Sequence, residues 1–271
     1  MMHLLSLEWK KFRKNSVVTL LTCFYFLFLP AASFIGKNLK TDGISPLIPG
    51  SDTYYSFPGV WEYLGYAGNW VVFFFLGVVA IYLVTAEVNY KTQRQSIING
   101  MTRESYFLSK LYAILTISFI ATIYYVIIAL ILGVINTEQY DFGYMFENNW
   151  AIPRYFLMSV GYLSFAMLLA YLLKKSGLAI FVYFSYVMII ELILRWVIHS
   201  KFFEGGSAKY YPLNAIEDLM PLPLWKIGKN FKMSDIDYNP LLSYTEAAGI
   251  SIVSIIAFIT ISWFVFKKSD I

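Results

Sequence analysis

The feature that most limits the fold of this chain is a series of six apolar stretches, each long enough to cross a bilayer as a helix. An α-helix rises about 1.5 Å per residue, so about 20 apolar residues span the hydrocarbon core. Five stretches contain no charged residue, and the remaining one contains only Glu191 and Arg195. We therefore predict an all-α, polytopic membrane protein with one six-span domain over residues 17–271. The predicted spans are 17–35, 69–86, 111–135, 155–173, 177–198 and 247–266.

The composition supports a membrane protein and disfavours several functions. Charged residues make up 14% of the 271 residues, whereas soluble domains carry about 25%. The single cysteine, Cys23, excludes an intrachain disulfide. His3 and His199 are far apart and have no cysteine partners, so we expect no metal site. The net charge of +4 is divided among short connectors, which disfavours nucleic-acid binding.

The charges of the connectors predict the orientation. Residues 1–16, 87–110, 174–176 and 267–271 contain twelve Lys and Arg against four Asp and Glu. The alternate connectors, 36–68, 136–154 and 199–246, contain eight against twelve. Because positive connectors stay in the cytoplasm, we expect a protein of the cell (inner or plasma) membrane with both termini cytoplasmic.

The first apolar stretch has an alternative interpretation as a cleavable signal peptide, since "LPAAS" offers small residues near its end. Its 19 apolar residues are longer than a typical signal core, which favours a retained span.

Residues 1–16 fit an amphipathic helix. The residues Met1, Met2, Leu5, Trp9 and Phe12 gather on one side, with Lys and Arg on the flank and the opposite side. Such a helix would lie in the headgroup layer of the membrane. The alternative is a basic anchor that only fixes topology.

The polar connector 87–110 has the pattern of a helix, a tight turn and a second helix. Gly100 is placed to end the first helix as its C′ residue, because glycine accepts a left-handed conformation. Thr102 is a plausible N-cap for the next helix, and Glu104 lies in its first turn, where the helix dipole favours an acid.

The exposed side of this element is the candidate interaction site, and the alternative is a solvated connector that only maintains topology. The candidate residues are Gln93, Arg94, Gln95, Asn99, Gly100, Thr102, Arg103 and Glu104.

The spacing of Glu87, Thr92, Gly100, Arg103 and Lys110 resembles the E-x(4)-T…G-x-x-R-x(6)-K pattern after the second span of type-2 permeases of ATP-binding-cassette (ABC) exporters. The resemblance extends to an interfacial amino-terminal helix, six spans and a long extracellular segment before the last span. Lys91 departs from the pattern, in which a small residue is common before the threonine. The resemblance implies that 87–110 contains a coupling helix that docks into an ATP-binding subunit.

The resemblance also implies an assembly of two permease subunits, identical or homologous, with two ATP-binding subunits. The chain has no G-x-x-x-x-G-K-[ST] loop, and its Gly228–Lys229 pair lacks the upstream glycine. We therefore expect no cofactor on this chain and no enzymatic activity of its own, with ATP and Mg bound by the partner.

Glu191 and Arg195 are one helical turn apart in the fifth span, where we expect them to pair. Such a pair either fixes helix packing or lines a translocation path or proton-linked site. The segment 199–246 contains short amphipathic pieces interrupted at Pro221 and Pro223. The resemblance suggests a re-entrant helical pair, and an ordered loop on the membrane surface is the alternative.

Two other classes of function compete with a permease. A membrane anchor or assembly protein would need no ATPase partner. An intramembrane enzyme would need converging catalytic groups, but the six spans hold no Asp or His, and Glu191 is their only carboxylate away from a span end.

Overall fold

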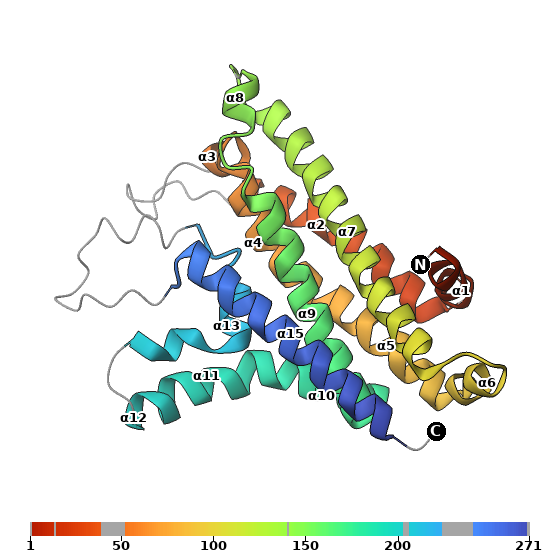
Figure 1. Cartoon of the computed structure of the whole chain (residues 1–271). Helices are drawn as coiled ribbons and strands as arrows, with labels where there is room; N and C mark the ends of the chain where they lie inside the picture. The colour runs from red at the N-terminus through yellow and green to blue at the C-terminus, as the bar shows by residue number, and fades with distance from the viewer. Residues whose placement is uncertain are drawn as a thin grey trace.

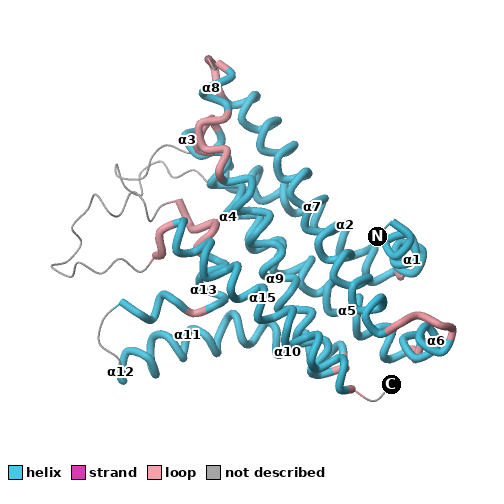
Figure 2. The backbone as a smooth tube through the Cα atoms, viewed as in Figure 1, coloured by secondary structure: helices cyan, strands magenta, loops and turns pink. Residues whose placement is uncertain are grey.

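The chain is all-α, as predicted, and its described residues contain helices and no strands (Figures 1 and 2). The computed structural model describes residues 2–13, 15–38, 52–139, 141–202, 206–223 and 241–269. The elements of the first half are α1 (Met2–Phe12), α2 (Ser16–Asn38), α3 (Asp52–Tyr55), α4 (Val60–Val71), η1 (Val72–Leu76), α5 (Gly77–Asn89), α6 (Thr92–Ile98), α7 (Arg103–Asn136) and α8 (Phe142–Met145). Those of the second half are α9 (Ala151–Leu173), α10 (Ser176–Ser185), η2 (Tyr186–Ile190), α11 (Glu191–Ile193), η3 (Leu194–His199), α12 (Ser200–Phe202), η4 (Gly206–Tyr210), α13 (Pro212–Glu217) and α15 (Tyr244–Lys268).

The predicted spans from the second to the sixth each lie within a long apolar helix. Five helices of the described chain are long and apolar enough to cross a membrane, and the number rises to six if the bent pair α1–α2 is counted as one. The five are Val60–Asn89, Arg103–Asn136, Ala151–Leu173, Ser176–His199 and Tyr244–Lys268. The protein is therefore a multi-pass α-helical membrane protein.

The second span begins earlier than its predicted start at residue 69, because the helix runs from Val60. Its first two turns carry polar groups, which the sequence pattern assigned to a loop. These groups find partners inside the bundle. Glu62 lies 3.8 Å from the Arg154 guanidinium, and the Trp61 indole N–H donates to the Met145 carbonyl at 2.8 Å.

The helices are packed around α9 and spread apart from one end of the molecule (Figure 1). α9 contacts α4, α5, α7, α10, α13 and α15, and its side chains are mostly buried. The α6 end, as we call it, carries α1, α6 and the carboxyl end of α15, whereas α8 lies at the far end of α7 (Figure 1). In contrast to α9, the helix Ser176–His199 is largely exposed.

The segment after η4 packs inside the bundle. A Cβ atom on Gly161, at the midpoint of α9, would lie 2.9 Å from Ile216 of α13. A Cβ on Gly65 would lie 2.6 Å from the Met220 sulfur. Glycines at these positions let α13 and the following Met220 approach α9 and α4 closely. The predicted amphipathic piece after Pro223 lies outside the described residues.

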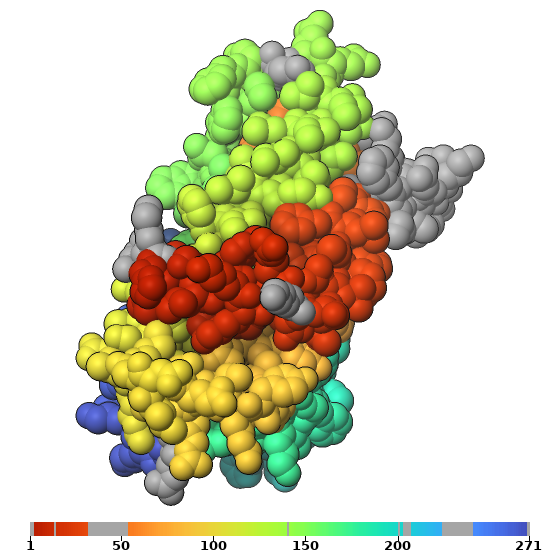
Figure 3. All heavy atoms as spheres, turned by 90° about the vertical axis from the view of Figure 1, so that its right-hand side faces the viewer, coloured from red at the N-terminus to blue at the C-terminus, as the bar shows by residue number. Residues whose placement is uncertain are grey.

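At the α6 end, α1 lies across the side of the bundle at a sharp angle to α2. The two helices meet at 96°, and the Asn15 side chain accepts from the backbone N–H groups of Val17 and Val18 at the start of α2. Figure 3 shows α1 lying between the α5–α6 region and α7. This placement connects the amino-terminal helix to the polar connector.

Candidate functional site

The turn between α6 and α7 has the predicted structure. Gly100 has φ +99°. The N–H of Gly100 donates to the Ile97 carbonyl and that of Met101 to the Ser96 carbonyl, the pair of bonds of a Schellman motif. Thr102 then caps α7 by accepting from the Ser105 N–H at 3.1 Å, and Glu104 lies in the first turn. The turn is thus fixed by local chemistry.

The connector differs from the prediction at its start, because the helix does not continue from the second span to Asn99. α5 ends at Asn89, and α6 begins at Thr92. Lys91 between them has φ +57°, a left-handed conformation that costs about 1–2 kcal/mol for a residue with a side chain. Glycine or asparagine would adopt this conformation at a lower cost.

One side of α6 packs on the bundle, and the other side is open. The exposed tip, as we call it, consists of Tyr90, Arg94, Gln95, Ile98 and Asn99. Tyr90 is 78% exposed and Ile98 is 72% exposed. Both residues lie in the connector, outside the apolar stretches that cross the membrane. Large apolar side chains exposed in a polar connector are typical of an interaction surface.

Gln93 and Arg103 do not lie on this tip, contrary to the predicted set of exposed residues. Gln93 is buried, because it lies one turn before Ile97 on the side of α6 that packs on the core. The Arg103 guanidinium donates to the Lys267 carbonyl at 2.6 Å and to the Ser269 carbonyl at 3.2 Å. Arg103 therefore caps the carboxyl end of α15. Gly100, Thr102 and Glu104 are exposed beside the tip.

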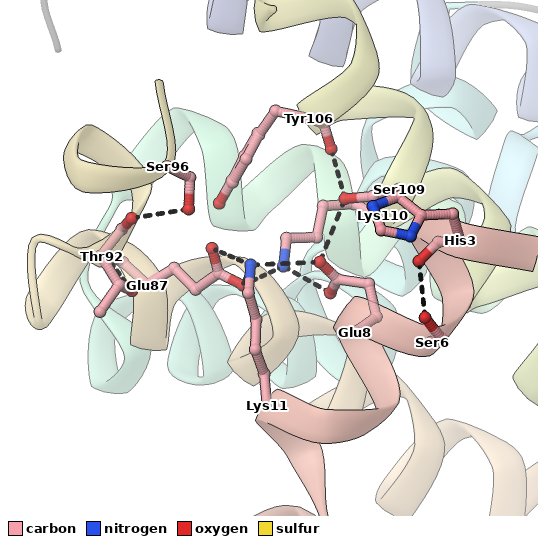
Figure 4. A network of polar contacts seen from close by, with 10 residues as sticks. All are labelled: His3, Ser6, Glu8, Lys11, Glu87, Thr92, Ser96, Tyr106, Ser109 and Lys110. Carbon is pink, nitrogen blue, oxygen red and sulfur yellow. Dashed lines mark hydrogen bonds and ion pairs between the residues drawn. The ribbon is translucent and has the colours of Figure 1, made fainter. Parts of the chain in front are cut away.

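Behind the tip lies a buried network of two acids and two lysines, which we call the ion network (Figure 4). Lys110 of α7 pairs with Glu87 of α5 and, at 2.6 Å, with Glu8 of α1. Lys11 pairs with Glu87 at 3.1 Å and with Glu8 at 3.5 Å. The Ser109 hydroxyl adds a hydrogen bond to Glu8 at 3.1 Å. Three helices that are distant in sequence are thereby joined at one point.

The ion network is electrically balanced, and three of its four residues are buried. Lys110 is fully buried, and Glu8 and Glu87 are 2% and 5% exposed. The Lys110 ammonium also lies 5.2 Å from the ring centroids of Phe12 and Tyr106. Burying an ion pair costs desolvation energy, so such a network is weak evidence for stability, but removing one partner costs about 3–5 kcal/mol. The network therefore fixes the relative positions of α1, α5 and α7.

The positions of Glu87 and Lys110 put the first and last residues of the predicted motif in contact. Thr92, the second residue of the motif, donates its hydroxyl to the Glu87 carbonyl at 3.4 Å across the Lys91 turn. The motif thus holds the base of the tip.

Sequence reasoning missed Glu8, although a signal was present. It is the only acidic residue among the first 41, within a segment rich in lysine and arginine. In an interfacial helix whose basic residues face lipid headgroups, an isolated acid indicates a partner within the protein. Its partner Lys110 is 102 residues away, which no local pattern could indicate.

Glu191 and Arg195 are both buried, but the expected pairing is replaced by contacts with residues 206–214. The Glu191 carboxylate accepts from the Asn214 N–H at 2.7 Å, and the Arg195 Nε donates to the Ala208 carbonyl at 3.2 Å. No ion pair joins them in the described part of the chain. The prediction assumed a regular α-helix, whereas η2 and η3 on either side of α11 are π-helical.

The carboxyl end of α13 carries a second buried acid. Asp218 accepts from the Leu242 N–H at 3.0 Å and from the Asn214 amide at 3.1 Å. Burial raises the pKa of Asp218 to about 6, although these bonds and Arg195 oppose the shift. Burial also raises the pKa of Glu217, next to the Asp218 charge. α13 is therefore fixed at both ends by carboxyl groups.

These features define an all-α, multi-pass membrane protein with an exposed tip mounted on a buried ion network. The chain belongs to the family described as "Protein of unknown function (DUF2705)", whose sequence model matches residues 45–271. A comparison with curated proteins gave no match.

Proposed function

We propose that this chain is the permease subunit of an ATP-driven ABC transporter, an exporter, in which two permease subunits form the translocation path. ATP is bound and hydrolysed by separate subunits that dock on the exposed tip. In this arrangement the α6 end faces the cytoplasm, as the excess of Lys and Arg in its connectors favours. The protein lies in the cell membrane with both termini inside.

The observation that carries the proposal is the exposed tip on its rigid base. Ile98 and Tyr90 offer apolar anchors, and Arg94 beside them offers a charge, which is the usual composition of an interface hot spot. Glu87 and Lys110 join the base of the tip to two long helices. A subunit that moves the tip therefore moves α5 and α7 together.

Affinity purification tests the docking. The tagged chain is extracted in mild detergent, and co-eluting proteins are identified by mass spectrometry. We expect a protein with the G-x-x-x-x-G-K-[ST] loop in a stoichiometric amount. Recovery of this protein without such a subunit, in active form, would instead support an anchor or assembly role.

Matched variants locate the docking surface. Ile98→Asp places a charge on the tip, whereas Phe142→Asp does the same at the α8 end, where Phe142 is 78% exposed. Loss of an interface anchor costs about 2 kcal/mol or more, so Ile98→Asp should lower recovery of the ATPase roughly tenfold or more. Phe142→Asp should leave recovery unchanged. Equal recovery with both variants would contradict docking at the tip.

A further inference from the structure

The carboxyl group of Glu191 has one satisfied oxygen and one unsatisfied oxygen. Oε1 accepts from the Asn214 N–H at 2.7 Å, in the first turn of α13. Oε2 is buried and has no hydrogen-bond partner among the residues that the structure describes, and the Leu213 N–H is a second backbone donor that acts on the carboxyl group. The whole residue is 2% exposed. A bare carboxylate oxygen in such a place is costly, because a buried charge is stable only when it is paired and hydrogen-bonded.

The charges around Glu191 do not balance in the fully ionised state. Three acids, Glu191, Glu217 and Asp218, lie within electrostatic reach of one guanidinium, that of Arg195. Lys209 acts on Asp218 as well. With every group charged, the cluster would carry a net negative charge in a buried place. The titratable and charged groups around Glu191 are Arg195, Tyr186, Lys209, Glu217, Asp218 and Tyr162.

Among the three acids, Glu191 is the best site for a proton. Asp218 accepts two hydrogen bonds, from Leu242 and Asn214, and these favour its charged form. Glu217 is partly exposed and can be hydrated. Glu191 has the bare buried oxygen. One free oxygen suits a proton, whereas a divalent cation such as Ca²⁺ needs about six to eight oxygen ligands.

We propose that Glu191 is a proton-binding site and that its proton is linked to the docking of α13 against the helix Ser176–His199. With α13 docked, Oε2 carries the proton as a neutral carboxylic acid, and Oε1 still accepts from Asn214. When α13 leaves, water reaches the carboxyl group and the O–H bond of Oε2 breaks, with the proton passing to solvent. Nothing is oxidised or reduced. Lower pH therefore favours the docked state, and higher pH favours release.

This linkage gives the helix Ser176–His199 a role that does not depend on which partner binds the tip. α13 packs on α9 and α15, so its release would open the side of the bundle away from the α6 end. A gradient of protons across the membrane would bias this movement.

Infrared spectroscopy of the full chain in lipid nanodiscs at pH 6.5 tests the site directly. A protonated carboxylic acid has a carbonyl band that carboxylates lack. We expect this band in the wild type and in Glu217→Gln, and its loss in Glu191→Gln. Labelling with ¹³C-glutamate should shift the band in the wild type. The shift shows that the band comes from a glutamic acid and not from an aspartic acid, and it requires no variant. Absence of the band, its failure to shift, or its persistence in Glu191→Gln would overturn the proposal.

Hydrogen exchange tests the linkage. Protection of the amides of residues 212–220, corrected for intrinsic exchange, should fall about tenfold per pH unit once Glu191 loses its proton on release. Glu191→Gln keeps an oxygen acceptor for Asn214 without a charge, so its protection should not change over that range. The Asp218→Asn background removes the second titrating acid. An equal pH dependence in Asp218→Asn with and without Glu191→Gln would overturn the linkage.

Discussion

The Nζ atom of Lys110 lies 2.6 Å from the Oε2 atom of Glu8, and this buried ion pair joins the middle of the chain to its amino-terminal helix. Glu87 completes the contact from α5, in the long helix Val60–Asn89. The three residues make α1 part of the base that holds the exposed tip. The amino-terminal helix is therefore connected to the bundle by charge as well as by the apolar contact of Phe12.

Lys110→Met should destabilise the protein by about 3–5 kcal/mol, because it leaves two buried carboxylates with only Lys11. Adding Glu8→Gln removes one of these charges and leaves Glu87 paired with Lys11, so the double variant should regain part of the loss. Lys11→Met should cost less, since the Lys11 side chain is 33% exposed. Apparent melting temperatures in detergent measure the series. Additive losses in the double variant would contradict a shared network.

Lys91→Gly should stabilise the junction between α5 and α6 by up to about 1 kcal/mol, because glycine accepts the positive φ at little steric cost. Lys91→Val should destabilise it, since a β-branched residue is strongly disfavoured there. Lys91→Asn removes the charge but tolerates the conformation, and it serves as the control. Hydrogen exchange of residues 88–99 ranks the three variants by the stability of the junction between α5 and α6. If Asn and Val have the same effect, the charge of Lys91 matters rather than its conformation.

Gly161→Ala should weaken the docking of α13 by about 1–3 kcal/mol, the usual cost of overpacking. The added Cβ would lie 2.9 Å from two carbon atoms of Ile216. Ile216→Ala alone should also destabilise, by leaving a cavity. Combined with Gly161→Ala it should cost less than the sum, because the new methyl group fills part of that space. A double-mutant cycle by limited proteolysis measures the coupling between the two positions. Strictly additive effects would show that Ile216 does not pack against residue 161.

Acidification should stabilise the segment around Asp218. Its pKa is raised from 3.8 to about 6 in the folded chain, so the folded state binds more protons than the unfolded state between these values. Stability therefore falls as pH rises from about 4 to about 6 and is constant above, with a change of at most about 3 kcal/mol. Burial raises the pKa of Glu217 in the same direction.

Asp218→Asn keeps an oxygen acceptor for the Leu242 N–H and cannot titrate, so its apparent melting temperature should vary less with pH than that of the wild type. Glu217→Gln provides the matched control for the neighbouring acid. A variant that retains the full pH dependence of the wild type would show that Asp218 is not its source.

The local features of the connector were predictable from sequence, and the long-range contacts were not. Gly100 and Thr102 act on their own neighbours, so residue type and spacing were sufficient. The Lys91 break was hidden because lysine rarely adopts a positive φ. The early start of the second span was hidden because Glu62 finds its partner, Arg154, in a helix far along the chain.

The polar groups of the bundle illustrate the same limit. The sequence spacing predicted that Glu191 and Arg195 pair. It contained no information about Asn214, whose N–H is the nearer partner of Glu191. A periodic pattern predicts which helix a residue lies on. It does not predict which distant backbone group will pack against that residue.

The measurement that tests the central claim most directly is ATP hydrolysis by the co-purifying ATPase, reconstituted in nanodiscs with and without this chain. The wild-type chain should change the hydrolysis rate severalfold, and Phe142→Asp should do the same. Ile98→Asp should return the rate to that of the isolated ATPase, because the tip no longer docks. A rate that is indifferent to the chain, or equally altered by Ile98→Asp and the wild type, would contradict coupling through the exposed tip.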